Sequence, residues 1–347
     1  MPYLGSLKAK TLQRIAILTG TTSAGSKAVL TESLIANLRP SSIPEHGGRI
    51  LSIDMGIRNL AYCVLETPKS TDLRAGNEAH EQALRVNEWK RLDLVSRLLL
   101  EGRATVLPVH EIDAAKDGRT PLPQNAFAPS VMSKVAYGIT RELLAYQPTT
   151  ILIERQRFRS GSSSAIQEWT IRVNMLESML WASFETQKMM QNASAQKSFP
   201  LMHEVSPKMV ARFWTAGPDA SLWPTQTLLT DSDDEPETPK KTGRSVDKKE
   251  KIAVVRSWLA GEGGVSLHLR PELQATVDAF AGKTTRVRRS KGVVDNDSSQ
   301  DRLIKLDDLA DCLLQGAAWL RWQQNRHEVS RLLAAHDFTL TEPSVYM

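Results

Sequence analysis

Cysteine is scarce in this chain, which has two cysteines, Cys63 and Cys312, in 347 residues. That scarcity excludes a disulfide-rich secreted scaffold and a zinc finger built on cysteines. Long apolar runs are missing too: no stretch reaches the ~18 apolar residues of a membrane-spanning helix, so no membrane partner is expected. The N-terminus lacks the apolar segment of a secretory signal peptide, and export is therefore not expected.

Charge of neither sign dominates, because 44 Lys and Arg face 39 Asp and Glu and leave a net charge of +5. This balance favours a polyanionic partner only mildly. The charges are unevenly placed, with five acids in 231–237, six bases in 240–251 and five bases in 283–291. Such blocks are typical of mobile segments, so we expect a charged, mobile insertion around 231–300.

Apolar periodicity predicts two short helices at the start of the chain, over 7–18 and 27–38. Gly20 is placed to end the first of them. Two short helices bury little surface alone, so residues 1–40 are expected to form a small helical hairpin followed by a linker. A Pro-containing and Gly-containing stretch, 39–48, fits that linker.

The middle of the chain alternates apolar strands and amphipathic helices. Residues 49–54 and 60–65 form two strands joined by a tight turn, and 86–94 fit a third strand. Helices are expected at 130–146, 164–190, 207–214 and 305–322, with strands at 150–154 and 201–205. Because the first two strands form a hairpin, this order predicts an α/β fold with a mixed sheet flanked by helices.

Carboxylates stand at three positions of that fold. Asp54 and Glu154 each end an apolar strand, where ligands of open α/β sheets tend to bind. The last helix adds Asp307, Asp308 and Asp311 beside its apolar stripe. On a helical wheel Asp307 and Asp311 share one flank, and like charges four residues apart destabilise a bare helix. A bound cation would offset that repulsion.

These five carboxylates offer oxygen ligands only, which suit Mg²⁺, with Mn²⁺ as a substitute, rather than Zn²⁺. Such a set can hold two metals roughly 4 Å apart, the arrangement used for in-line attack on a phosphodiester. Bases follow Glu154 directly: Arg155, Arg157 and Arg159 alternate with Phe158 around a short polar loop. They can contact phosphates and stack on a base. A solvated loop that balances nearby acids is the alternative interpretation.

Three runs of sequence together resemble one known family. Residues 52–62, 153–160 and 305–314 are similar to the fungal mitochondrial Holliday junction resolvases, which are ribonuclease H-like nucleases related to the bacterial RuvC resolvase. The N-terminal hairpin resembles a SAP-type DNA-binding motif through Leu12, Gly20, Gly25, Lys27, Leu30, Leu34 and Leu38. The resemblance is weakest over 66–125 and 215–300.

The resemblance implies a Mg²⁺-dependent homodimer that nicks two opposed strands of a four-way junction in mitochondrial DNA. It implies a SAP-like hairpin at 1–40, a ribonuclease H-like nuclease domain at 48–325 and a C-terminal tail at 326–347. Its catalytic and metal-binding residues fall on Asp54, Glu154, Asp307, Asp308 and Asp311. The RuvC spacing pairs Asp308 with Asp311, whereas the helical wheel pairs Asp307 with Asp311. Contacts to DNA are expected from Lys27, Arg155, Arg157, Phe158, Arg159 and Lys305.

Three other functions compete with this interpretation. An actin-like or sugar-kinase-like ATPase also has a strand followed by Asp-x-Gly, but it needs a second Asp-x-Gly hairpin, and Asp54–Gly56 is the only one here. A non-catalytic DNA-binding protein leaves the five carboxylates unexplained. A ribonuclease H-like nuclease that cuts another substrate, such as an RNA–DNA hybrid, is separated least well by sequence.

Overall fold

A computed structural model describes residues 3–38, 47–67, 84–104, 126–156, 168–192, 198–215, 248–262, 264–282 and 299–335. Within these ranges one sheet has the strand order β5-β4-β1-β2-β3-β6. The strands are β1 (Gly48–Asp54), β2 (Leu60–Thr67), β3 (Leu84–Leu92), β4 (Thr150–Glu154), β5 (Leu201–Val205) and β6 (Leu267–Leu269). β1, β2 and β3 are antiparallel neighbours, whereas β4 runs parallel to β1, β5 to β4 and β6 to β3. The predicted mixed sheet is confirmed.

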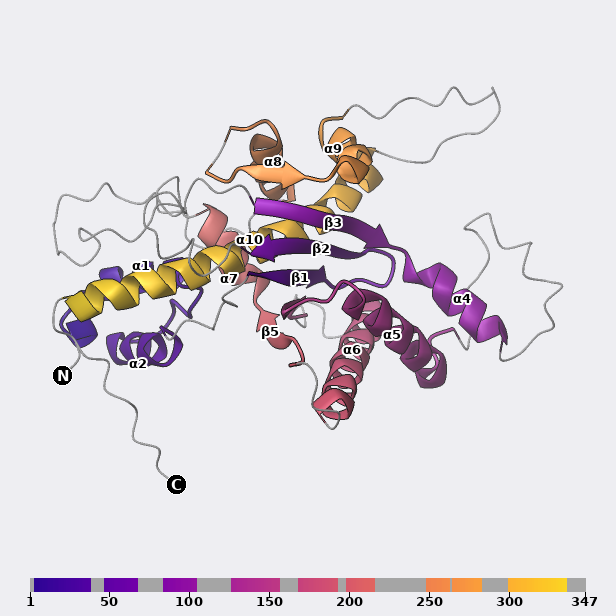
Figure 1. The fold of residues 1–347 in the computed structure, drawn as a ribbon, viewed down its shortest axis with the longest axis horizontal. Coiled ribbons are helices and arrows are strands. Elements are labelled where there is room, and N and C mark those ends of the chain that lie inside the picture. Colours follow the sequence, from indigo (N-terminus) through magenta and orange to yellow (C-terminus); the bar gives the residue numbers. More distant parts are fainter. Residues whose placement is uncertain are drawn as a thin grey trace.

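Helices cover both faces of the sheet, because successive side chains of a strand point to opposite faces. Leu51 and Ile53 of β1 pack on one face with helices α5 (Pro129–Leu144) and α6 (Glu168–Asn192). Ile50 of the same strand packs on the other face with α10 (Ser299–Ala335). Figure 1 shows α5 and α6 on one side of the strands and α10, in yellow, behind them. The predicted flanking helices are therefore present.

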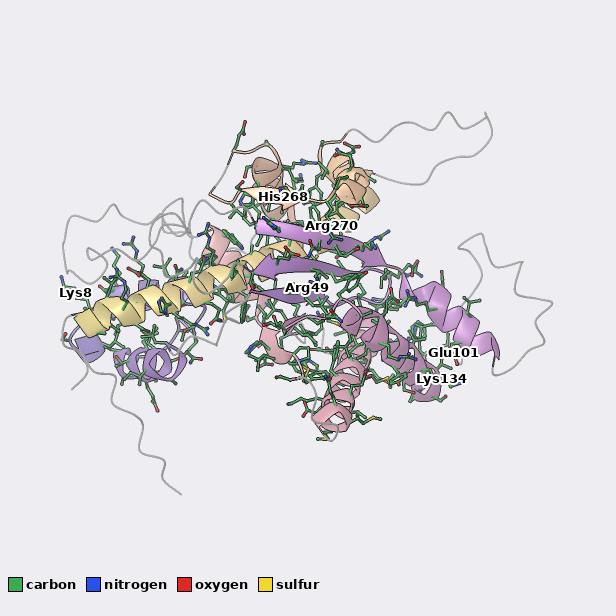
Figure 2. The ribbon with its side chains drawn as sticks, in the orientation of Figure 1. Lys8, Arg49, Glu101, Lys134, His268 and Arg270 are labelled. Atoms are coloured by element: carbon green, nitrogen blue, oxygen red, sulfur yellow. The ribbon has the colours of Figure 1, made fainter. Side chains whose placement is uncertain are left out.

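Shorter helices complete the two layers. α4 (Leu94–Ala104) follows β3 and lies beside α5, where Lys134 and Glu101 form an ion pair of 2.8 Å that Figure 2 shows at the edge of the molecule. The α10 side carries α7 (Pro207–Thr215), α8 (Lys248–Leu259) and α9 (Gln274–Phe280), with a 3-10 turn, η6 (Pro271–Leu273), before α9. Between β2 and α10, Cys63 and Cys312 are both buried, and the Cys63 thiol donates to the Cys312 carbonyl at 3.2 Å.

The N-terminal hairpin is part of the main core. A 3-10 turn, η1 (Tyr3–Gly5), precedes α1 (Ala9–Leu18) and α2 (Lys27–Asn37), and the Ser26 hydroxyl accepts from the Val29 N–H at the start of α2. Leucines of both helices belong to the same apolar cluster as Trp322 and Val329 of α10. In Figure 1 the far end of α10 lies against α1. The hairpin is thus built onto α10.

Two predicted boundaries differ from the structure. The late helix runs to Ala335, so the first ten residues of the predicted tail at 326–347 are helical, and residues 336–347 lie outside the described ranges. The predicted mobile insertion at 231–300 contains α8, β6 and α9, and Ile252, Val255 and Trp258 of α8 are buried in the core. Ile252, Val255 and Trp258 recur every three residues, as expected of a packed helix, but the neighbouring charge blocks led to the prediction of a mobile segment. Residues 231–247 and 283–298 lie outside the described ranges.

Membrane insertion finds no support in the described helices. None of them combines the length and the apolar character that a transmembrane segment needs.

Candidate active site

Two carboxylates are placed by strand pairing. β1 and β4 are parallel neighbours in which Ile53 is paired with Ile153, so the next residues, Asp54 and Glu154, end the two strands side by side. Backbone hydrogen bonds of the sheet fix that separation, because parallel strands lie about 4.8 Å apart. Asp54 is almost fully buried, with 8% of its surface exposed.

Helix α10 supplies a third carboxylate above the same strand ends. The Gln315 side-chain amide donates to the Ser52 hydroxyl at 3.0 Å and to the Ile53 carbonyl at 3.2 Å. Gln315 lies one helical turn beyond Asp311, so these bonds hold Asp311 over β1. Gly316 follows, where an added Cβ would overlap the Leu65 side chain, so the absence of a side chain lets the helix approach the sheet closely.

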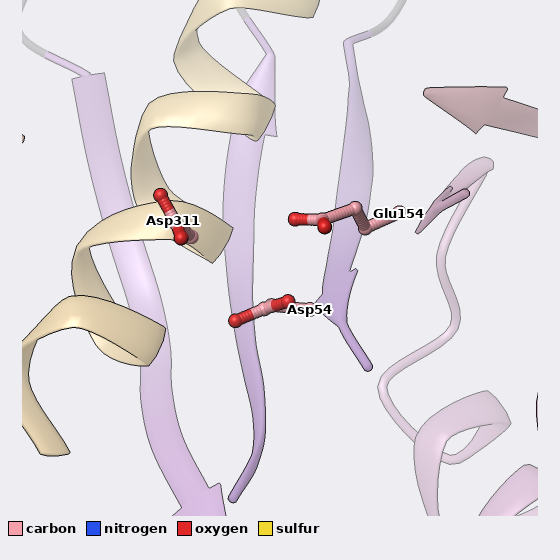
Figure 3. A group of neighbouring side chains, drawn as sticks. All are labelled: Asp54, Glu154 and Asp311. Carbon is pink, nitrogen blue, oxygen red and sulfur yellow. The ribbon is translucent and has the colours of Figure 1, made fainter. Parts of the chain in front are cut away.

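The three carboxylates converge. One oxygen from each of Asp54, Glu154 and Asp311 lies within 4.8 Å of the other two, and Figure 3 shows the side chains turned toward one another from β1, β4 and α10. All three donors are carboxylate oxygens, which fit a hard divalent cation rather than zinc. This group is a metal-binding candidate of the kind that the sequence predicted.

Without a bound cation, the ionised forms of these carboxylates are electrostatically unfavourable. Burial raises the pKa of Asp54 well above its usual value, and the charges of Glu154 and Asp311 raise it further. Burial also raises the pKa of Asp311 to about 6, although Lys251 lowers it. Both directions mean that the ionised carboxylates are destabilised by loss of water and by one another. A bound divalent cation would favour the ionised forms.

Asp308 and Asp307 lie outside the group of three. The pKa of Asp308 is raised to about 7, first by burial and then by the neighbouring Asp307 charge. Its Oδ2 is buried and has no hydrogen-bond partner among the described residues. Asp308 also contributes to the raised pKa of Asp54, so its charge reaches the centre of the group. Asp307 is ion-paired with Lys248 at 2.9 Å.

Sequence reasoning missed two lysines beside these acids. Lys251 of α8 pairs with Asp311 at 2.7 Å, and Lys248 of the same helix pairs with Asp307. Both lie in the block 240–251 that was interpreted as part of a mobile insertion. The apolar residues that follow at helical spacing, Ile252 and Val255, were the available signal for a packed helix.

The predicted DNA-contacting residues have mixed positions. Lys27 is exposed at the first position of α2. Arg155 follows Glu154 directly, and its guanidinium lies 3.7 Å from the carboxylate of Glu204 with most of both side chains exposed. Lys305 lies in α10, but its side chain is outside the described part of the chain. Outside the described ranges altogether are Arg157, Phe158 and Arg159.

Comparison with known protein families identifies the family to which this chain belongs. The family model described as "Mitochondrial resolvase Ydc2 / RNA splicing MRS1" matches residues 50–329, which include β1, β4 and most of α10. The chain belongs to this family. The resemblance found in the sequence is thereby confirmed, and the Ydc2 family match spans every carboxylate of the candidate site.

Two curated relatives match nearly the whole chain. The "cruciform cutting endonuclease 1, mitochondrial" of Schizosaccharomyces pombe is 26% identical over 324 residues, 92% of this chain and 94% of the relative. The protein of the same name from Saccharomyces cerevisiae is 22% identical over 336 residues, 94% of this chain and 84% of the relative. The family description and both names include the word mitochondrial, which confirms the predicted location at the level of the family.

A solved structure confirms the fold. The crystal structure of the yeast mitochondrial Holliday junction resolvase Ydc2 superposes with a TM-score of 0.55 and 23% identity. The match covers 95% of this chain and 99% of that one. This chain and Ydc2 therefore share one fold, and the predicted α/β fold with a mixed sheet flanked by helices is confirmed.

Proposed function

We propose that this chain is a metal-dependent endonuclease that resolves four-way DNA junctions in mitochondria. The observation that carries the proposal is the convergence of Asp54, Glu154 and Asp311 from three separate elements, in a chain that belongs to a resolvase family. A protein that only binds DNA has no need of three converging, mutually repelling carboxylates, one of them buried. Metal-dependent hydrolysis of a phosphodiester, in contrast, uses such a set to hold its metals.

Mg²⁺ is the cation that the donors favour, with Mn²⁺ able to replace it. The three carboxylates offer oxygen only, and Mg²⁺ is commonly held by one or two carboxylates together with phosphate oxygens of the substrate. When bound, a pair of such metals activates water and stabilises the leaving 3′ oxygen. Asp54 and Glu154 hold their positions through the strand register, and Asp311 holds its position through the bonds of Gln315 to β1.

We assign the fourth metal-binding carboxylate to Asp308. Asp308 Oδ2 and Asp307 Oδ1 are both buried without a hydrogen-bond partner among the described residues, but it is the charge of Asp308 that helps to raise the pKa of Asp54. Asp307 is engaged by Lys248 instead. This choice agrees with the three-residue spacing implied by the RuvC resemblance and disagrees with the helical wheel. Asp307 then serves to neutralise Lys248 and to shape the acidic end of α10.

The substrate is a junction held by a homodimer of this chain. A four-way junction has approximate two-fold symmetry, and a two-fold dimer places identical sites on two opposed strands. Exposed bases contribute the phosphate contacts, among them Lys27 on the hairpin and Arg155 beside the acids. Light scattering of the purified chain should give a dimer. A monomer that still makes paired, symmetric cuts would contradict this part of the proposal.

The test of the function compares substrates side by side. Labelled four-way junctions, linear duplexes, flaps, RNA–DNA hybrids and folded RNA are incubated with the protein in Mg²⁺ and in chelator. We expect paired cuts in the junction alone, and none in chelator. Equal cutting of all substrates, or preferred cutting of the hybrid, would replace junction resolution by a broader nuclease activity. RNA binding without any cutting would favour the splicing function that the family description also names.

A further inference from the structure

Helix α8 brings a pair of lysines to the acidic end of α10. Lys248 pairs with Asp307 and Lys251 with Asp311. The earlier lysine of α8 therefore pairs with the earlier aspartate of α10. The side chains of Ile252, Val255 and Trp258 anchor the helix, because all three are buried in the core. The lysines therefore approach the acids from a packed element, at positions that the fold determines.

The two lysines are not equivalent. Lys248 keeps 56% of its side chain exposed, whereas Lys251 keeps 20% and lies against an Asp311 side chain that is 18% exposed. Lys251 also lines a small pocket together with Glu154, Asp311 and Gln315. Of these two lysines, Lys251 is therefore the one that lies beside the group of three carboxylates, and Lys248 lies further from it.

Lys251 and a cation bound by the three carboxylates would share the negative charge of Asp311. The Lys251 ammonium lies 2.7 Å from Oδ2 of Asp311, a separation typical of a charge-assisted hydrogen bond. A divalent cation between Asp54, Glu154 and Asp311 would compete with that ammonium, since both are attracted to the same carboxylate. Lysine has a flexible stem with several rotatable bonds, so its charge can move several ångströms while its helix stays in place.

We propose that Lys251 holds Asp311 in position before the metal binds. Its ammonium group then moves away from Asp311 and contacts a non-bridging oxygen of the scissile phosphate. This inference rests on the proposed nuclease function. The phosphate carries the negative charge that the displaced ammonium needs as a partner, and Lys251 lines a small pocket together with Glu154 and Asp311. No bond is made or broken by Lys251 itself.

The test separates metal binding from cleavage. Lys251→Met keeps the apolar stem and removes the charge, and Lys248→Met is the matched control one turn earlier on the same helix. Calorimetry measures Mn²⁺ and Mg²⁺ binding to the full chain without DNA, and single-turnover assays measure cleavage at saturating metal and protein. We expect Lys251→Met to bind the cation about tenfold more tightly, because a competing positive charge close to the site is gone. Its cleavage should be at least ~10-fold slower, the cost of one lost charge contact to the phosphate.

Controls make the outcome decisive. Lys251→Arg should recover part of the cleavage rate, Lys251→Gln should reproduce the tighter metal binding, and Lys248→Met should change the metal affinity less than about twofold. Unchanged or weaker metal binding in both uncharged variants would overturn the proposal, as would tighter binding with an unchanged cleavage rate. The calorimetric arm needs no DNA, so a wild-type protein that cuts no junction would refute the proposed function while the competition at Asp311 is still measured.

Discussion

The two halves of α10 pack on the same apolar core but differ in the polar groups that they carry. The first half, Leu306–Leu320, faces the sheet and carries acids whose charges repel one another. The second half, Trp322–Leu333, carries apolar side chains that pack against the N-terminal hairpin and two polar ones, Asn325 and Arg326, that are hydrogen-bonded to it. There, the Asn325 amide donates to the Leu18 carbonyl at 2.7 Å, and the Arg326 guanidinium donates to the Thr19 carbonyl at 2.8 Å.

The difference indicates where stability and activity come from. Buried polar groups with partners stabilise a structure, whereas buried charges without enough partners destabilise it. The first half therefore keeps its acids at a cost that the rest of the fold offsets. Because one uninterrupted helix carries both halves, the hairpin has a fixed position relative to the candidate active site. Changes in the first half should alter chemistry with little effect on folding, and changes in the second half should do the reverse.

The largest expected effect is on cleavage by Asp311→Asn. Losing this carboxylate should lower the single-turnover rate more than about 100-fold, beyond the loss usual for residues that only support a metal ligand. Junction affinity in chelator should stay equal or rise, because a charge that repels phosphates is gone. The thermal midpoint should change little. Wild-type cleavage by this variant would show that Asp311 is not needed for the chemistry.

A comparison of Asp308→Asn with Asp307→Asn sharpens the assignment within the first half. The cleavage rate of the Asp308 variant should fall about 10- to 100-fold. The rate of the Asp307 variant should fall less, because Asp307 is already ion-paired with Lys248. The same single-turnover assay at saturating Mg²⁺ measures both. The reverse order would support the helical wheel and assign the metal to Asp307.

Gly20→Ala tests the second half. Gly20 has a φ of 62°, and an added Cβ would overlap the Trp322 ring of α10. The backbone strain and the clash together should destabilise the protein by about 2–4 kcal/mol. Gly138→Ala is the matched control, because nothing lies within 4 Å of a Cβ there and alanine favours a helix. Chemical denaturation measures both; equal midpoints would mean that the hairpin is not docked on α10.

The smallest effect concerns DNA binding by the hairpin. Lys27→Ala removes one exposed base, so junction affinity should fall a few-fold and the slope of log K against log salt should drop by about 0.9. Cleavage at saturating protein should be retained. Fluorescence anisotropy over a salt series measures the slope. An unchanged slope would place the phosphate contacts of the hairpin elsewhere.

The sequence was sufficient for strands β1 to β5 and for part of the candidate site, whereas β6 lies in the predicted mobile insertion. Asp54 and Glu154 were predictable because a carboxylate at the end of an apolar strand lies at a shared edge of the sheet. Asp311 was identified because like charges beside an apolar stripe need a partner. The helical wheel favoured Asp307 over Asp308, because it could not take account of Lys248, which pairs with Asp307 from a helix distant in the chain.

The lysines were missed for a related reason. Charge blocks are typical of mobile segments, and in 240–251 this signal outweighed the apolar spacing of Ile252, Val255 and Trp258. The docking of the hairpin was also beyond sequence reasoning. It depends on backbone carbonyls of Leu18 and Thr19 that accept hydrogen bonds from α10. Every residue has such a carbonyl, so the sequence does not indicate which ones are used.

The two thiols between β2 and α10 have a practical consequence for following the reaction. Cys63 and Cys312 are the only cysteines of the whole chain, and neither exposes any surface. Thiol-reactive dyes therefore have little access to the native protein while it is folded. A single cysteine introduced on an exposed face, at Lys134 of α5 for example, becomes a unique attachment point. The natural sequence is thus already a background for fluorescence energy transfer between the protein and a labelled junction arm.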